Sequence, residues 1–163
     1  MQKIIVSDAS PIGYLIRIDK LELLEIIYGA IIIPEAVYQE IFRLENLGYN
    51  LSAFKNSKWI KVLKPIDISN IDTYKSILDK GELEALSIAI SYNADLVIID
   101  EKLGRFVAKQ IGFDITGLVG ILIAAKIRGH ITSIKKILDS VIALGFRISK
   151  NLYITTLIAY NEQ

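Results

Sequence analysis

A chain of 163 residues, 52% of them hydrophobic, is long enough to form one domain with a substantial core. It contains no cysteine and a single histidine, His130, which excludes disulfides, thiolate zinc sites and cysteine nucleophiles and argues against a histidine-based catalytic triad. The net charge of +1 shows no global excess of basic residues, so any nucleic-acid binding must use a local patch.

The sequence shows no membrane-spanning or targeting segment. Its most continuous apolar stretch, residues 117–125, is far shorter than the roughly 18 to 20 residues that a spanning helix needs. Residues 1–3 lead directly into the strand-like run 4–6, which leaves no room for a secretion signal. We therefore expect a single-domain protein, residues 1–163, located in the cytoplasm.

Short β-branched runs alternate with helical patterns along the first part of the chain. The first predicted strand, residues 3–7, ends at Asp8, and Ser10 with Pro11 then marks a helix start with serine as N-cap. This helical pattern continues to about Tyr28. The next expected elements are a strand at 31–33, a helix opened by Pro34, a surface loop at 46–58 and a strand at 59–63.

The second part of the chain continues the same alternation. After Pro65 the expected elements are one or two helical turns, a helix at 81–92, a strand at 96–99, a helix at 103–110, a strand near 113–115 and a helical C-terminal segment from about 117. Parallel strands need crossover connections, which are usually helical. The pattern therefore predicts a three-layer α/β/α fold with a central parallel sheet of about four to five strands.

Two acidic residues follow predicted strands. In open parallel sheets, ligands bind beyond the carboxyl ends of the strands. Asp8 and Asp100 occupy that edge, whereas Asp95 precedes the strand at 96–99 and should be structural.

Two predicted helices add further candidates, because a turn of about 100° per residue sorts their acids by face. Glu40 lies at the flank of the apolar stripe of its helix, and Glu35 points away. Glu82 shares a face with Ala85 and points inward, whereas Glu84 lies opposite.

Each of these acids also has a purely structural interpretation. Asp8 or Asp100 could cap the helix that follows it, and Glu82 could favour a helix N-terminus through the helix dipole. Glu40 could pair with a neighbouring Lys or Arg. The set is more informative than its members, since converging carboxylates repel one another unless a cation neutralises them.

A hard divalent cation suits such a set. Mg²⁺ or Mn²⁺ prefers carboxylate and water oxygens, and zinc is less expected without cysteine or clustered histidine. A metal ion held this way can activate water for the hydrolysis of a phosphodiester. The acids thus indicate metal-dependent nuclease chemistry.

Four ordered motifs resemble those of PIN domains, which are metal-dependent ribonucleases and often toxins of toxin–antitoxin pairs. The motifs are Val6-Ser7-Asp8-Ala9-Ser10, Pro34 to Glu40, Gly81-Glu82-Leu83-Glu84-Ala85-Leu86 and Leu96-Val97-Ile98-Ile99-Asp100. The resemblance implies that Asp8, Glu40, Glu82 and Asp100 form the acidic metal and catalytic site, with Ser10 in a supporting polar position.

The resemblance has two departures and one open role. Glu82 stands where many PIN domains carry aspartate, and Glu101 directly follows the fourth acid, where many members carry a further acid a few residues later. Arg105 could bind substrate phosphate or pair with a carboxylate. The C-terminal third is similar to a branch of PIN-related proteins that carries no assigned function.

The resemblance implies RNA as substrate and an antitoxin as a possible protein partner. The mean hydropathy of +0.42 and the run 117–125 suggest more apolar surface than a small domain needs, which a homodimer or an antitoxin complex would bury. The alternative is a catalytically inactive PIN-like module that acts through protein contacts.

Overall fold

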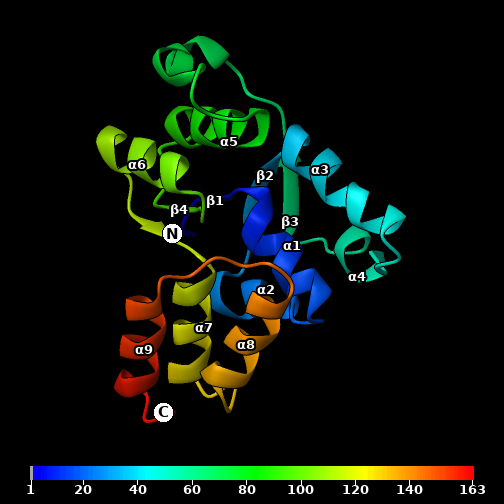
Figure 1. The fold of residues 1–163 in the computed structure, drawn as a ribbon. Coiled ribbons are helices and arrows are strands. Elements are labelled where there is room, and N and C mark those ends of the chain that lie inside the picture. The colour runs from blue at the N-terminus through cyan, green and yellow to red at the C-terminus, as the bar shows by residue number, and fades with distance from the viewer. Residues whose placement is uncertain (1) are drawn as a thin grey trace.

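The computed structural model describes residues 2–163 and contains a five-stranded, all-parallel sheet in the order β3-β2-β1-β4-β5 (Figure 1). The strands are β1 (Ile5–Ser7), β2 (Ile31–Pro34), β3 (Ile60–Leu63), β4 (Leu96–Ile98) and β5 (Ile115–Thr116). The central strand β1 pairs on one side with β2 and on the other with β4. The predicted parallel sheet is confirmed.

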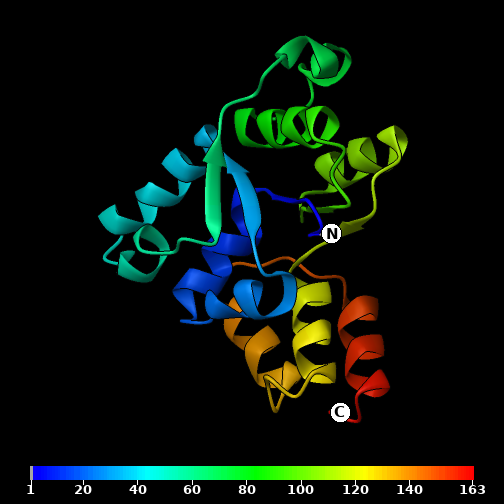
Figure 2. The same cartoon turned by 180° about the vertical axis from the view of Figure 1, so that it is seen from behind.

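Helices cover both faces of the sheet, as Figures 1 and 2 show from opposite sides. The helical elements are α1 (Ala9–Arg17), α2 (Glu22–Tyr28), α3 (Glu35–Asn46), α4 (Ser52–Lys55), the 3₁₀ helix η1 (Ile68–Tyr74), α5 (Lys80–Ser91), α6 (Lys102–Ile111), α7 (Leu118–Ile127), α8 (Ile134–Ala143) and α9 (Lys150–Ala159). The predicted three-layer α/β/α arrangement is confirmed.

The alternation of side chains along the strands divides the core in two. Val6 and Val97 pack with η1, α5 and α6 on one face. Ile5 and Ile98 point to the other face and pack with α1, α2, α7 and α8. Both faces are apolar because successive strand residues point to opposite sides and both sides are covered.

The start of α1 differs from the sequence prediction. Asp8, not Ser10, holds the N-cap position, and Ser10 is the second residue of the helix. The backbone turns into the helix immediately after β1, so Pro11 occupies the third helical position. Placing the N-cap at Ser10 was therefore wrong by two residues.

Two further local predictions were incomplete. The helical pattern from Ser10 to Tyr28 is broken between α1 and α2, where Asp19 has a positive φ of 57° and ends the first helix. The expected loop at 46–58 contains the short helix α4, whose first residue, Ser52, donates its backbone N–H to the Asn50 side chain. The first feature depends on the left-handed backbone of Asp19 and the second on a local side-chain hydrogen bond, and apolar periodicity reports neither.

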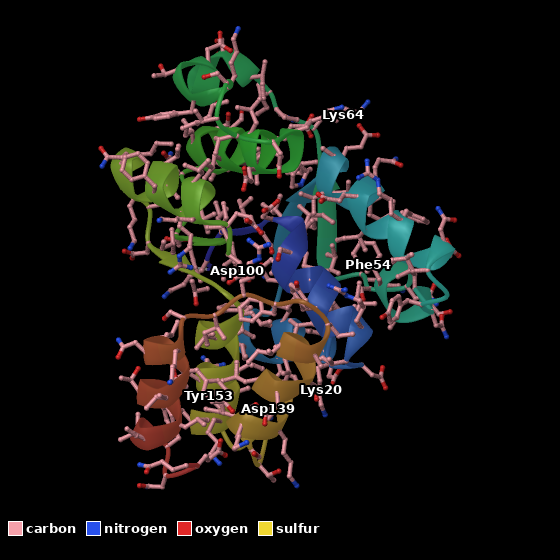
Figure 3. The ribbon with its side chains drawn as sticks, viewed as in Figure 1. Lys20, Phe54, Lys64, Asp100, Asp139 and Tyr153 are labelled. Carbon is pink, nitrogen blue, oxygen red and sulfur yellow. The ribbon has the colours of Figure 1, made fainter. Side chains whose placement is uncertain are left out.

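The last three helices, α7, α8 and α9, lie side by side below the sheet in Figures 1 and 2. Tyr153 of α9 donates its hydroxyl hydrogen to Asp139 of α8 at 2.6 Å, and Figure 3 labels both residues. Glu162 accepts hydrogen bonds from the backbone N–H groups of Ile134 and Lys135. Across residues 2–163 no helix is long and apolar enough to cross a membrane.

Candidate functional site

Asp8 lies at the carboxyl end of the central strand. Its backbone N–H donates to the Ile98 carbonyl of β4 at 2.9 Å, and its side chain is only 4% exposed. The side chain makes no capping hydrogen bond to α1. The backbone N–H of Ala9, the first residue of α1, nevertheless lowers the pKa of the Asp8 carboxyl, so Asp8 keeps an interaction with the start of that helix.

Glu40 and Asp8 approach each other across Gly81. A Cβ atom on residue 81 would lie 3.2 Å from Glu40 Oε2 and 3.3 Å from Asp8 Oδ1. Gly81 is buried near the start of α5, where that helix packs against β1 and α3. The missing side chain thus makes room for two carboxylates from separate elements.

The two carboxylate oxygens of Glu82 have different surroundings. Its Oε2 accepts the backbone N–H of Asp79 at 3.1 Å, while Asp79 Oδ1 accepts the Glu82 N–H at 2.8 Å, which forms a capping box. Glu82 Oε1 lies 3.3 Å from the position of a Cβ on Gly104 of α6. The side chain is 4% exposed, so Glu82 is an inward-facing acid, as expected.

Asp100 contacts the start of α7. Both of its carboxylate oxygens accept the Leu118 backbone N–H, at 3.1 and 3.2 Å, and the carboxylate lies against Gly117. Its structural role is therefore at α7 rather than at α6, the next helix in sequence. Figure 3 shows Asp100 between α6 and the segment that joins α8 to α9.

Arg105 is part of the same neighbourhood. Its guanidinium donates to the Ile99 carbonyl at 2.8 Å, and its positive charge lowers the pKa of Asp100. The hydrogen-bond partner of Arg105 is thus a backbone carbonyl, and the two roles considered for it, binding substrate phosphate and pairing with a carboxylate, both stay predictions.

Burial raises the pKa values of the four acids. The pKa of Asp8 rises from 3.8 to about 8, that of Glu82 from 4.5 to about 7 and that of Asp100 from 3.8 to about 6, with loss of solvent as the largest cause in each case. The pKa of Glu40 is also raised, first by partial burial of its carboxyl and then by Asp79. These groups lack enough positive charge around them to stay ionised without cost.

Electrostatic coupling divides the four acids into a close group and a more distant member. Glu40 and Glu82 both raise the pKa of Asp8. The charged groups that shift the pKa of Asp100 are instead Arg105, which lowers it, and Glu101, which raises it. Glu101 links the two parts, because it also raises the pKa values of Glu40 and Glu82.

Sequence reasoning did not select Asp79. The structure places this exposed acid beside Asp8, Glu40 and Glu82, and it raises the pKa of all three. The spacing Asp79-x-x-Glu82 is a capping-box signature, so a search for helix starts would have found it. Glu101, noted only as an adjacent acid, belongs to the same electrostatic group.

The discarded acids have structural partners elsewhere. Asp95 accepts the Ile4 backbone N–H at 2.7 Å, at the edge opposite to Asp8. Glu84 accepts the Ala36 N–H at 3.2 Å, and Glu35 forms an ion pair with Lys64 at 3.5 Å. His130 lies exposed in the turn after α7.

The carboxylates of this site are ligands of the type that a hard divalent cation prefers, but they are not already arranged around a single ion position. Every donor is a carboxylate, and several have raised pKa values that a cation would reverse. Within residues 2–163, however, no three acidic or histidine side chains stand in an arrangement that could hold one ion. Binding therefore requires the side chains to draw together, which the exposed Glu40 is free to do.

Ser10 lies beside the acids and lines two surface hollows. One, of about 180 Å³, also includes Glu40, and the other, of about 430 Å³, includes Asp100. Ser10 therefore borders both parts of the acidic group, and its supporting role stays a prediction.

Comparison with known proteins identifies the family of the chain. A search of curated proteins found no match. The family model DUF3368, described as a PIN domain, matches residues 4–162. That match spans nearly the whole chain and includes the parallel sheet and all four strand-end and helix acids. The chain therefore belongs to the PIN-domain family, whose fold is of the nuclease type.

Proposed function

We propose that this protein is a divalent-metal-dependent endoribonuclease that hydrolyses phosphodiester bonds in RNA. The observation that carries the proposal is the group of acids at the carboxyl edge of the sheet, where two buried carboxylates, Asp8 and Glu82, have pKa values raised to about 8 and about 7. Perturbed acids gathered at a ligand-binding edge are typical of functional sites.

Asp8, Glu40, Glu82 and Asp100 would hold Mg²⁺ or Mn²⁺. The ion would lower the pKa of a bound water and offset the charge that builds up on the phosphoryl group. Arg105 donates to the Ile99 carbonyl beside Asp100, and its positive charge lowers the pKa of that carboxyl. Ser10 offers its hydroxyl as a donor to a phosphate oxygen, and a carboxylate of the group accepts the proton of the attacking water.

The biological role that we propose is that of the toxin in a toxin–antitoxin pair, acting in the cytoplasm. Several large apolar side chains are exposed, among them Ile127 at 69% and Ile158 at 50%. Such surface is available for a homodimer or for an antitoxin. The compartment and the partner follow from the family's usual role rather than from a contact in this structure.

A second candidate is an inactive PIN-like module that works through protein contacts. It is favoured by the structural hydrogen bonds of two of the acids, Glu82 to the Asp79 N–H and Asp100 to the Leu118 N–H. In that case these carboxylates serve the fold alone. The two candidates differ in whether loss of a carboxylate changes the chemistry or only the stability.

The test is cleavage of single-stranded RNA in Mg²⁺ or Mn²⁺ by the wild type and by Asp8→Asn. We expect the variant to lose at least about a hundredfold in rate, because a ligand and its negative charge are removed at the centre of the group. Asp95→Asn, at the opposite edge, is the matched control and should retain wild-type activity. Equal activity of Asp8→Asn and wild type would contradict the proposal, as would no cleavage with either metal.

A further inference from the structure

The segment that joins α8 to α9 passes beside the acidic edge. A hollow of about 430 Å³ lies between them, and its lining includes Ser10, Asp100, Lys102 and Arg147. Because Ser10 and Asp100 belong to the acidic site, this hollow opens directly from it. Figure 1 shows the joining segment running across the upper ends of α7 and α8, on the side of these helices that faces the sheet.

The joining segment has a fixed backbone. Gly145 ends α8 with a positive φ of 105°, and the Phe146 N–H then returns to the Val141 carbonyl at 3.0 Å. The Phe146 ring is 9% exposed and meets the Tyr14 ring of α1 edge-on, with 5.3 Å between their centres. The backbone at Arg147 is therefore already fixed. When Arg147 binds a ligand, little more than the Arg147 side chain has to become ordered, which keeps the entropic cost of binding small.

The two cations of this hollow come from different parts of the sequence. Lys102 is the first residue of α6, and Arg147 lies on the joining segment; both are exposed. Arg147 also borders a second hollow of about 570 Å³ that is walled by Ile148 and Tyr153. Arg147 thus borders both the hollow that contains Asp100 and the hollow that contains Tyr153.

The hollow on the other side of the acids has a different balance of charges. This space of about 630 Å³ between α3 and α5 is lined by four acids and two cations, namely Glu35, Glu40, Asp79, Glu84, Arg43 and Lys80. The hollow beside Arg147 has two acids and two cations, and one of those acids, Asp100, is a proposed metal ligand. The lining on the α3–α5 side thus carries two more negative than positive charges, whereas the charges on the Arg147 side balance. A polyanion that reaches the acidic site is therefore repelled less on the Arg147 side, where two cations are available to bind it.

We propose that Arg147, assisted by Lys102, binds the phosphate adjacent to the scissile one in single-stranded RNA, and that the strand continues toward Tyr153. This inference rests on the proposed nuclease function, and it gives Arg147 the phosphate-binding role that the sequence pattern had considered for Arg105. A guanidinium suits the task because it can donate two parallel hydrogen bonds to one phosphate.

The test is equilibrium binding of a short, fluorescently labelled single-stranded RNA, measured in the Asp8→Asn background so that binding is separated from cleavage. Arg147→Ala should weaken binding by about tenfold, and Arg147→Lys should recover part of the loss. The dependence of log affinity on log salt should become shallower by about 0.7 for the one lost phosphate contact. Lys136→Ala removes an exposed cation on α8 away from the hollow and should leave affinity and salt dependence unchanged.

Cleavage and metal binding complete the design. With Asp8 restored, Arg147→Ala should raise KM and leave the affinity for Mn²⁺ at its wild-type value, since Arg147 binds substrate and not the ion. If Arg147→Ala binds RNA like the wild type while the wild type cleaves RNA, the subsite is wrong and the nuclease proposal stands. If the wild type does not cleave but Arg147→Ala still loses affinity and salt dependence, the nuclease proposal fails and the binding subsite stands. Absence of RNA binding by the wild type overturns both.

Discussion

The Asp8 carboxyl makes the stability of the metal-free protein depend on pH. Its pKa is 3.8 in ordinary surroundings and about 8 in the folded protein. The folded state therefore binds this proton more tightly than the unfolded state, and the resulting stabilisation is complete below about pH 4 and is lost as the pH rises to 8. Glu82, with a pKa of about 7, acts in the same direction over a narrower range.

We predict that the melting temperature in EDTA falls by about 5 to 10 °C between pH 5 and pH 8.5 through these groups. Asp8→Asn, which cannot ionise, should remove most of the fall above pH 7. Thermal unfolding followed by circular dichroism at several pH values measures both effects. A wild-type melting temperature that rises across this range would show that Asp8 is not buried in its neutral form.

Gly117 leaves the space that the Asp100 carboxylate occupies. A Cβ at this position would overlap Asp100 Oδ1, while the backbone itself, with φ of −137°, is acceptable for alanine. We predict that Gly117→Ala displaces the carboxylate and lowers RNA cleavage by about tenfold or more, with the fold retained. Gly13→Ala in α1 is the matched control, because its Cβ would meet Leu44 at an ordinary 3.8 Å. Loss of activity in both variants would point to a general effect on packing.

At the scale of the element, Asp79 at the start of α5 both caps the helix and adds negative charge to the acidic site. Asp79 caps the helix through its side-chain oxygen and also adds negative charge beside Glu82. Asparagine keeps the capping oxygen and removes the charge. Alanine removes both, so the two substitutions separate the roles.

We predict that Asp79→Ala lowers the free energy of unfolding by about 1 kcal/mol, whereas Asp79→Asn leaves it close to the wild-type value. Both variants should lower the pKa of Glu82, because both remove a neighbouring negative charge. Urea unfolding measures the first effect, and NMR titration of the Glu82 carboxyl carbon measures the second. Equal destabilisation by the two substitutions would show that the charge, and not the cap, stabilises α5.

Apolar periodicity was sufficient to predict most elements but not their ends. The pattern at 81–92 predicted α5 to within one residue at each end, because buried residues such as Ala85 and Ala89 recur at helical spacing. The break after Arg17 was missed, since it depends on the left-handed backbone of Asp19. The helix start at Ala9 was misplaced because Ser10-Pro11 satisfies capping preferences that the chain does not use there.

At the scale of the whole molecule, strand ends predicted which acids share an edge, but not how they couple. The rule for parallel sheets placed Asp8 at the ligand edge and Asp95 at the opposite one, where it binds the Ile4 backbone. The contact of Asp100 with Leu118 depends on how α7 packs after β5, which no local pattern reports. The position of Arg147 beside Asp100 also depends on helix packing, because the segment between α8 and α9 returns to the edge of the sheet.

The central place of β1 determines when during protein synthesis the acidic site can exist. Asp8 is made almost at the start of the chain, but β4, whose Ile98 carbonyl accepts the Asp8 N–H, pairs with β1 from far along the sequence, with Leu96 opposite Ile5. Asp100 is fixed only when Leu118 has followed it. A nascent chain that ends before β4 therefore lacks the strand whose Ile98 carbonyl accepts the Asp8 N–H. For the proposed nuclease, which would use Asp100 as well as Asp8, we expect the complete acidic site to form only after the chain has been made as far as Leu118.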